Sequence, residues 1–351
     1  TLIAIIVGKK ITLRERLILQ DAMNTFNIQG LVKMVKYVLL FTIFVQFFGA
    51  LLFSTQFVPQ FGLVRGTFYS IFHSISAFCN AGFDVFGNFS SLTNYNSNFV
   101  VIMVASALII IGGLGFTVWS ELYNAKNLRR VSTHSKMVLL MTAILVIGGT
   151  ILMYLFEHKN PNTIREMSFF DQIMNSFFAS VSPRTAGFNS ISTDGMTTAG
   201  QFLTIILMFI GGAPGSTAGG IKVTTIGVLF FTVLSTIRGR EDTEVFGRKF
   251  TKDLVYKAFS LFFLASGLVI VVTMLLSYTE KDVSFMALLY ETASAMGTAG
   301  LSLGLTSHLS DIGKCLIIFM MYIGRVGPLT VVLSLTRNKI NTGVRYPDGK
   351  I

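Results

Sequence analysis

Three short strings in the chain have residue types suited to binding a cation through the backbone. They are Cys79-Asn80-Ala81-Gly82-Phe83, Arg184-Thr185-Ala186-Gly187-Phe188 and Gly297-Thr298-Ala299-Gly300-Leu301. Each contains Asn or Thr, then Ala, Gly, and Phe or Leu. Because glycine adopts positive φ without strain, successive carbonyl groups can point in one direction. Rings of carbonyl oxygens replace the hydration shell of an alkali cation. The strings therefore predict a selectivity filter that holds an alkali cation through backbone oxygens.

Each filter string follows a short apolar segment: Thr67–Phe78, Phe169–Val181 and Phe285–Met296. At about 12 residues these segments are shorter than the ~17–25 residues that cross a bilayer as a helix. We interpret them as re-entrant half-helices whose C-terminal ends carry partial negative charge toward a cation at mid-membrane. Packing glycines in a helix bundle are the alternative. That alternative accounts for isolated glycines, but not for three half-length helices that end in the same string.

Longer apolar runs flank the half-helices and predict the membrane spans. They are Tyr37–Phe53, Phe99–Val118, Met137–Phe156, Phe202–Leu234, Leu254–Leu276 and Ile312–Leu335. The order span, half-helix, span recurs three times and predicts an all-α integral membrane protein. We expect residues 1–30 to be the end of a first repeat and a cytoplasmic connector. Residues 31–130, 131–245 and 246–351 are then the second, third and fourth repeats, the last with a cytoplasmic tail.

Composition and charge agree with a membrane protein. Hydrophobic residues make up 52% of the 351 residues and charged residues 13%, against ~25% charged in soluble domains. This excludes a soluble or disordered chain. The net charge is +11, and most basic residues fall in segments 1–36, 121–136, 235–257 and 337–351. The positive-inside rule assigns these connectors and the C-terminus to the cytoplasm, so the charge needs no nucleic-acid partner.

The span Phe202–Leu234 is interrupted by residues with weak helix propensity. The interruption reads Gly211-Gly212-Ala213-Pro214-Gly215-Ser216-Thr217-Ala218-Gly219-Gly220. Proline removes a helical hydrogen bond and glycine is a poor helix former. The segment is either a proline kink or a flexible loop below the filter that obstructs the pore as a gate. Its spacing approaches that of a phosphate loop, but Ile221 precedes Lys222 and no strand leads into it, which excludes nucleotide binding there.

Three basic residues lie close to the expected ion path. Arg325 is in the last span, and an intramembrane charge usually faces a cavity or a partner. It is either an electrostatic barrier below the filter that contacts the loop, or a structural arginine. Lys222 either contributes to the same barrier or lies at the depth in the membrane that cytoplasmic water reaches. Arg184 would repel cations if it pointed into the path, so we expect it to point backwards and pair with an acid, with Glu291 as the candidate.

The filter strings, GGAPGSTAGGIK at 211–222 and YIGRVGP at 322–328 resemble the Trk/Ktr/HKT superfamily of potassium transporters, and most closely the Ktr membrane subunit (KtrB-like). The resemblance covers essentially the whole chain. It implies a single-chain pseudo-tetramer with potassium-channel-like architecture, and potassium uptake that is typically sodium-dependent. It also implies a homodimer on a cytosolic ring of nucleotide-binding regulatory subunits (KtrA-like). Any nucleotide is then on the partner, with no organic cofactor in this chain.

The sequence departs from the family pattern in three places. The first repeat and its filter are largely absent, only one glycine is common to the three filter strings, and Arg184 stands close to the cation path. The main alternative function is a secondary transporter of a small organic solute, built around a broken helix at the membrane midplane. The interrupted span fits it, but the three half-helices do not. An intramembrane enzyme is a third class, for which the chain has neither an H-E-x-x-H nor a G-x-S-x-G motif.

Overall fold

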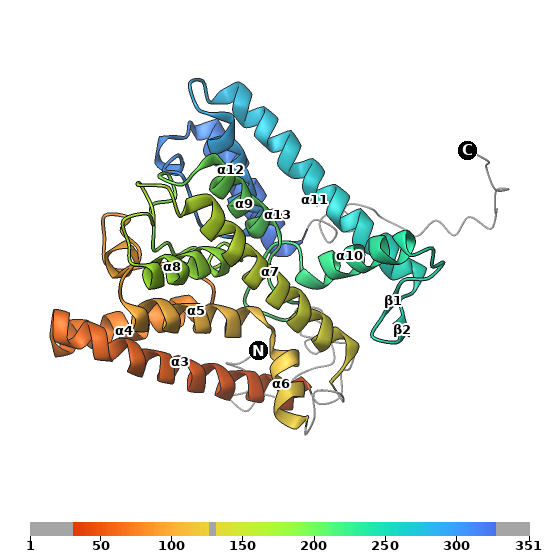
Figure 1. The fold of residues 1–351 in the computed structure, drawn as a ribbon, viewed down its shortest axis with the longest axis horizontal. Helices are drawn as coiled ribbons and strands as arrows, with labels where there is room; N and C mark the ends of the chain where they lie inside the picture. The colour runs from red at the N-terminus through yellow and green to blue at the C-terminus, as the bar shows by residue number, and fades with distance from the viewer. Residues whose placement is uncertain (1–30, 126–130, 328–351) are drawn as a thin grey trace.

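The computed structural model describes residues 31–125 and 131–327, and these residues are mainly helical (Figure 1). The predicted end of a first repeat at 1–30 and the tail after residue 327 lie outside the described residues. The strands found in the described part are β1 (Glu244–Val245) and β2 (Arg248–Lys249), which pair antiparallel with Glu244 opposite Lys249. Three consecutive groups of helices follow the order predicted from the repeats.

The first group runs from α3 to α6. Helix α3 (Leu31–Phe61) is followed by the half-helix α4 (Leu63–Phe78), and a loop with the short 3-10 helix η1 (Thr93–Tyr95) leads to α5 (Phe99–Gly113) and α6 (Phe116–Asn124). Helix α3 extends beyond the predicted Tyr37–Phe53 and includes Pro59 near its end. Helix α4 has 16 residues, or about 24 Å at 1.5 Å per residue, which is still shorter than a ~30 Å hydrocarbon core.

The second group runs from α7 to α10. Its helices are α7 (Thr133–Glu157), the half-helix α8 (Phe169–Val181), α9 (Thr198–Phe209) and α10 (Val223–Ile237). Helix α8 has the predicted bounds because local signals set both ends. The hydroxyl oxygen of Ser168 accepts a hydrogen bond from Asp171 N at 3.2 Å, and Pro183 follows the C-cap, where a helix ordinarily stops. The predicted interruption of Phe202–Leu234 is present as residues 210–222 between α9 and α10.

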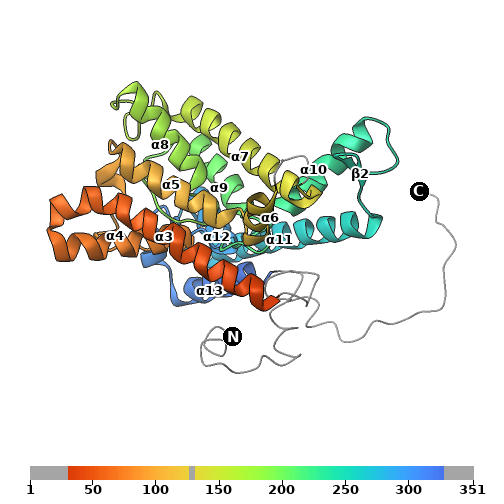
Figure 2. The ribbon, with the colours of Figure 1, turned by 90° about the horizontal axis from the view of Figure 1, so that it is seen from below.

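The third group contains α11 (Lys252–Thr279), the half-helix α12 (Phe285–Gly297), the short η3 (Thr306–His308) and α13 (Asp311–Val326). The N-cap of α12 is Ser284, whose hydroxyl oxygen accepts from Ala287 N at 3.3 Å. Its C-cap is Thr298, which is left-handed with φ 52°. In all three groups the half-helix packs against the long helix that precedes it, as Figure 2 shows for α4 with α3 and α8 with α7.

Helices α3, α7 and α11 are long and apolar enough to cross a membrane, and α5 with α6 is a fourth candidate that is bent by 92°. Many of their large apolar side chains are exposed, such as Phe47, Ile147 and Phe263, as expected for surfaces that contact lipid. The predicted span Phe99–Val118 is present as this bent pair and not as one straight helix. The helix stops at Gly113 and restarts at Phe116, because residues of the α9–α10 loop bind the backbone groups at the break.

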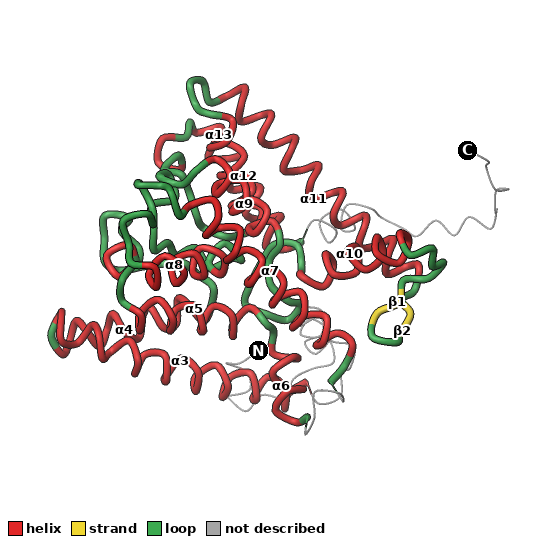
Figure 3. The backbone as a smooth tube through the Cα atoms, in the orientation of Figure 1, coloured by secondary structure: helices red, strands yellow, loops and turns green. Residues whose placement is uncertain are grey.

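The longer loops gather at the end of the molecule where the half-helices begin, and the β1–β2 hairpin lies at the other end (Figure 3). Side chains at the C-terminal ends of the half-helices form part of the core: Phe78, Phe178 and Met296 are each exposed by 1% or less. The core therefore surrounds the points where the three filter strings begin. The fold thereby holds these strings between packed helices.

Candidate functional site

The three filter strings repeat one backbone conformation. In each string the Asn or Thr and the glycine two residues later both have positive φ: Asn80 51° and Gly82 71°, Thr185 75° and Gly187 81°, Thr298 52° and Gly300 82°. The alanine between them is not among the described residues with positive φ. Alternation of left-handed and ordinary conformations turns successive carbonyl groups to one side of a strand. This is the arrangement that carbonyl ligation of a cation requires.

The three strings meet one another. A Cβ built on Gly82 would lie 2.6 Å from the carbonyl oxygen of Ala186, and a Cβ built on Gly187 would lie 2.6 Å from the carbonyl oxygen of Ala299. A Cβ on Gly300 would be 3.7 Å from Cα of Gly187. The glycines therefore bring strands from three separate half-helices into direct contact. Any side chain at Gly82 or Gly187 would displace a neighbouring filter strand.

Each filter strand is also tied to a serine near the end of its own half-helix. Ala81 N donates to Ser76 O, Ala186 N to Ser182 O and Ala299 N to Ser294 O, all at 2.9 Å. In two strands the serine side chain adds a second bond. The hydroxyl of Ser76 donates to Phe83 O at 2.8 Å, and that of Ser182 donates to Phe188 O. The repeated bond fixes the inner part of each strand to the helix that carries it.

The interruption between α9 and α10 forms a closed loop rather than a simple kink. Ile210 and Ile221 make a parallel bridge at its neck. Gly211 N donates to Ile221 O at 2.9 Å, and Val223 N donates to Gly212 O at 3.0 Å. These bonds hold the ends of the loop together.

The loop binds the break between α5 and α6. Ala213 N donates to Gly113 O at 2.9 Å and Phe116 N donates to Gly215 O at 3.1 Å. Gly115 turns the chain at this point with φ 87°, and a Cβ there would lie 2.8 Å from Pro214 O. The carbonyl at the end of α5 and the first amide of α6 thus find partners in the loop. The two broken segments satisfy each other's backbone.

The loop also touches the filter region and two basic side chains. Thr217 Oγ1 donates to Phe78 O, at the C-terminal end of α4, at 3.1 Å, and a Cβ on Gly219 would collide with the side chain of Thr298. Arg325 Nη1 donates to Thr217 O at 3.1 Å and Lys222 Nζ donates to Ala218 O at 2.8 Å. The predicted contact between Arg325 and the loop is therefore present. The loop lies against the filter strands with two positive charges bound to it.

Comparison with known proteins gives a consistent assignment. The model of a family described as "TrkH: Cation transport protein" matches residues 2–341. The chain belongs to the TrkH family. It is 43% identical over 351 residues, 99% of this chain and 77% of the relative, to the potassium/sodium uptake protein NtpJ of Enterococcus hirae. It is 39% identical over 350 residues to the Ktr system potassium uptake protein B of Bacillus subtilis, covering 100% of this chain and 78% of that protein.

A solved structure has the same fold as this TrkH-family chain. The potassium transporter TrkH from Vibrio parahaemolyticus superposes with a TM-score of 0.73 at 18% sequence identity, covering 92% of this chain and 68% of that one. The resemblance read from the filter strings and the interrupted span is thus confirmed, as is a mainly helical fold of this type. Among the described residues, no group of three His, Cys, Asp or Glu side chains could hold a metal ion.

The structure corrects the prediction for Arg184 of this TrkH-family chain. Its side chain is buried, with 6% exposed, but no acid of the described residues lies within 4.0 Å of it. Its Nε has no hydrogen-bond partner in the part of the chain that the structure describes. Glu291 instead accepts hydrogen bonds from Ser302, at 2.8 Å, and from Thr306. The predicted pair is therefore wrong, because hydroxyl groups of the loop after the third filter already bind that carboxylate.

Sequence reasoning did not identify a set of contacts at the C-terminal ends of α7 and α11. Glu157, at the end of α7, accepts from Thr197 N at 2.9 Å, and Glu280, after α11, accepts from Ser310 N at 3.1 Å. Thr197 and Ser310 are the N-caps of α9 and α13. Bonds from Ser310 to Glu280 hold the pKa of that carboxyl below its usual value. A glutamate at the end of the first span in two repeats was the available signal.

Proposed function

We propose that the chain is the ion-translocating subunit of a Ktr-type potassium-uptake system in the cell membrane. The observation that carries this proposal is the contact of three filter strands that share alternating positive φ. Their carbonyl groups would bind potassium, with the ligands supplied by Cys79–Phe83, Arg184–Phe188 and Gly297–Leu301. Sodium is proposed as a coupling ion, supported by the potassium/sodium uptake named for the E. hirae relative.

We further propose that a fourth filter strand completes the ring to a pseudo-tetramer. Within the described residues, Gly82 and Gly187 each adjoin the next strand closely, whereas a Cβ on Gly300 meets only Gly187 Cα within 4 Å. That open side of Gly300 supports the position of a further strand between Gly300 and Gly82. Four strands would surround an ion with carbonyl groups from all sides.

The loop Gly211–Gly220 is proposed as the gate. Its support is its contact with the ends of α4 and α12 and its bonds to Arg325 and Lys222. These two cations would oppose the passage of potassium while the loop is closed. An ion path could then open by displacement of the loop without change in the filter.

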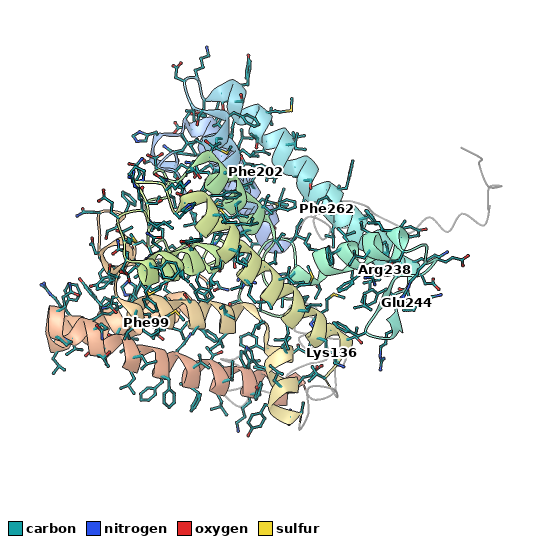
Figure 4. The ribbon with its side chains drawn as sticks, viewed as in Figure 1. Phe99, Lys136, Phe202, Arg238, Glu244 and Phe262 are labelled. Carbon is teal, nitrogen blue, oxygen red and sulfur yellow. The ribbon has the colours of Figure 1, made fainter. Side chains whose placement is uncertain are left out.

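The chain is proposed to dimerise and to bind a cytosolic nucleotide-binding ring through its basic connectors. The names of three relatives describe Ktr systems, which supports partner subunits. Lys136, Arg238 and Glu244 lie away from Phe99 and Phe202, the latter two near the starts of α5 and α9 (Figure 4). We assign the end with Lys136 and the hairpin to the cytoplasm because basic connectors are retained there.

Uptake by the full-length protein tests this function. The protein is expressed in a strain that lacks its own potassium uptake, and rubidium influx is measured with potassium, sodium or an organic solute as competitor. We expect growth on low potassium and competition by potassium well above that by sodium. Competition by organic solutes but not by potassium would contradict the proposal and favour the secondary transporter.

A further inference from the structure

The filter strands of α4 and α8 each end in a carbonyl group bound by a serine hydroxyl. Ser76 Oγ donates to Phe83 O at 2.8 Å, and Ser182 Oγ donates to Phe188 O. Both serines are buried, with 4% and 1% of their surface exposed, and both belong to the C-terminal ends of half-helices. The two carbonyls are thus bound by the half-helix that carries the strand, whereas Gly82 and Gly187 touch the neighbouring strands.

The direction of these two bonds decides where the outer carbonyl groups point. A carbonyl oxygen that accepts from a hydroxyl of the half-helix points toward that half-helix, and not toward a cation held between the strands. The carbonyls of the preceding residues point in another direction. Asn80 and Gly82, like Thr185 and Gly187, have positive φ and alternate with residues of ordinary conformation, which directs the carbonyls to one side. The set of ion-facing carbonyls in these strands therefore stops at the glycine.

We propose that the hydroxyls of Ser76 and Ser182 are positioning groups that hold the carbonyls of Phe83 and Phe188 out of the ion path and fix the outer ends of two filter strands. This inference rests on the proposed potassium filter and refines it. Carbonyl ligands in these strands end at Gly82 and Gly187, and the aromatic residues after them only flank the mouth of the filter.

The third strand lacks this second bond. Ser294 O accepts from Ala299 N like its counterparts, but among the residues that the structure describes no hydroxyl of α12 donates to Leu301 O. Leu301 also replaces the aromatic residue of the other two strings. The outer end of the filter is thus asymmetric: two strands are bound there by a serine of their own half-helix, whereas the third is bound one residue later, at Ser302 O, by Thr193 Oγ1 at 2.7 Å.

Removing a hydroxyl should loosen the outer end of one strand. A neutral hydrogen bond typically shifts an equilibrium by roughly two- to tenfold, and a released carbonyl can turn between the ion path and the half-helix. For Ser76→Ala and Ser182→Ala in the full-length protein we expect discrimination of potassium against sodium to fall about fivefold. The maximal uptake rate per protein in the membrane should change less than the Michaelis constant for potassium.

Two other buried serines provide matched controls. Ser70, in α4, and Ser176, in α8, donate to the carbonyl groups of Gly66 and Gln172 of their own helices, each at 2.7 Å. Ser70→Ala and Ser176→Ala remove a hydroxyl from the same half-helices without touching a filter strand. Both controls should keep the selectivity of the parent. Ser76→Thr retains the hydroxyl and should restore at least part of the selectivity that Ser76→Ala loses.

A binding measurement keeps the test independent of transport. Purified protein is heated in increasing potassium chloride or sodium chloride, and the concentration that gives half of the maximal rise in Tm is compared. The two alanine variants should need more potassium, with little change for sodium. Unchanged selectivity and unchanged potassium protection in Ser76→Ala and Ser182→Ala, or equal losses in the controls, would overturn the inference. Failure of the parent to transport potassium would instead contradict the proposed function.

Discussion

Gly300 is the filter-string residue at which we expect a substitution to reduce potassium affinity and selectivity. Its φ is 82°, and among the described residues a Cβ there would meet only Gly187 Cα, at 3.7 Å. A side chain here would enter the space proposed for the fourth strand, and a left-handed conformation costs a non-glycine residue about 1–2 kcal/mol. We expect Gly300→Asp to lower potassium affinity and sodium exclusion by about tenfold, through misdirected carbonyl groups, as measured by uptake at graded potassium and sodium.

Gly304 is the matched control for this substitution. It has φ 85° with no atom within 4 Å of a built Cβ, and it lies after the filter string. Gly304→Asp introduces the same charge and a similar strain without moving a filter carbonyl, so potassium affinity should be retained. Parental potassium affinity and sodium exclusion in Gly300→Asp would remove Gly300 from the filter.

At the scale of elements, the closed loop between α9 and α10 and the bend between α5 and α6 stabilise each other. The loop supplies partners for Gly113 O and Phe116 N, groups that an unbroken helix would have satisfied internally. The loop is held to its surroundings by such bonds and by those of Thr217 with Phe78 O and Arg325, so it can detach without unfolding the helices around it. This arrangement suits a movable obstruction better than a rigid kink.

Removing the obstruction should raise transport. A cation about 4 Å from a fixed positive charge meets a Coulomb energy of roughly 4 kcal/mol at an effective dielectric constant of ~20. Deletion of most of Gly211–Gly220, or Arg325→Ala, should therefore increase the maximal rate of potassium uptake severalfold while ion selectivity is kept. Rates are measured at saturating potassium and divided by the amount of protein in the membrane.

Lys314→Ala is the control for Arg325→Ala, because Lys314 lies in the first turns of the same helix and contacts Asp311 at 3.9 Å. Its uptake rate should equal that of the parent. A well-expressed loop-deleted protein that transports more slowly than the parent would show that the loop is a structural or coupling element.

The contact between α11 and α13 predicts a pH dependence of stability. Hydrogen bonds from Ser310 hold the pKa of Glu280 below its usual value, so the folded state favours the carboxylate. Its contribution to stability is present above the pKa of the unfolded chain, near 4.3, and is lost as the pH falls through the lower folded value. In Glu280→Gln, Tm at pH 7 should fall by a few degrees, and the loss of Tm between pH 5 and pH 3 should be smaller than in the parent.

Glu166→Gln serves as the comparison, because Glu166 is exposed in the loop after α7. It should change neither Tm at pH 7 nor the slope of Tm with pH. An unchanged pH slope in Glu280→Gln would show that the carboxylate bonds do not contribute to the acid sensitivity of the fold.

Over the whole molecule, features encoded in local residues could be predicted from the sequence, and features that depend on distant partners could not. The bounds of α8 follow from Ser168 and Pro183 in its own flanks. The break at Gly115 depends on a loop about a hundred residues later, so hydropathy favoured a continuous span. The partners of Glu291 likewise depend on where Ser302 and Thr306 lie in the folded chain, which no spacing along the chain reveals.

The concentration of basic residues in a few connectors predicts where a regulatory partner binds. The expected docking surface for a regulatory ring includes Leu122–Lys136 and Arg238–Lys252, as well as Lys9–Arg16, which lies outside the described residues. Arg248 and Lys249 are exposed in the β1–β2 hairpin. Association driven by such charges weakens as salt shortens the screening length, which is about 10 Å at 0.1 M.

Charge reversal at the hairpin should therefore weaken ring binding. We expect the double variant Arg248→Glu with Lys249→Glu to bind purified regulatory ring at least tenfold more weakly at low salt, with a smaller difference at high salt, because the reversed charges repel the ring. The control reverses Lys159 and Lys281, two exposed lysines of the loops after α7 and α11, and should bind normally, since the proposed orientation places those loops on the side of the membrane opposite the ring. Crosslinking in mild detergent should trap a dimer in all three proteins. Equal weakening of ring binding by both double variants would contradict this assembly. So would a parent protein that is trapped only as a monomer without bound ring. The basic connectors would then determine membrane orientation alone.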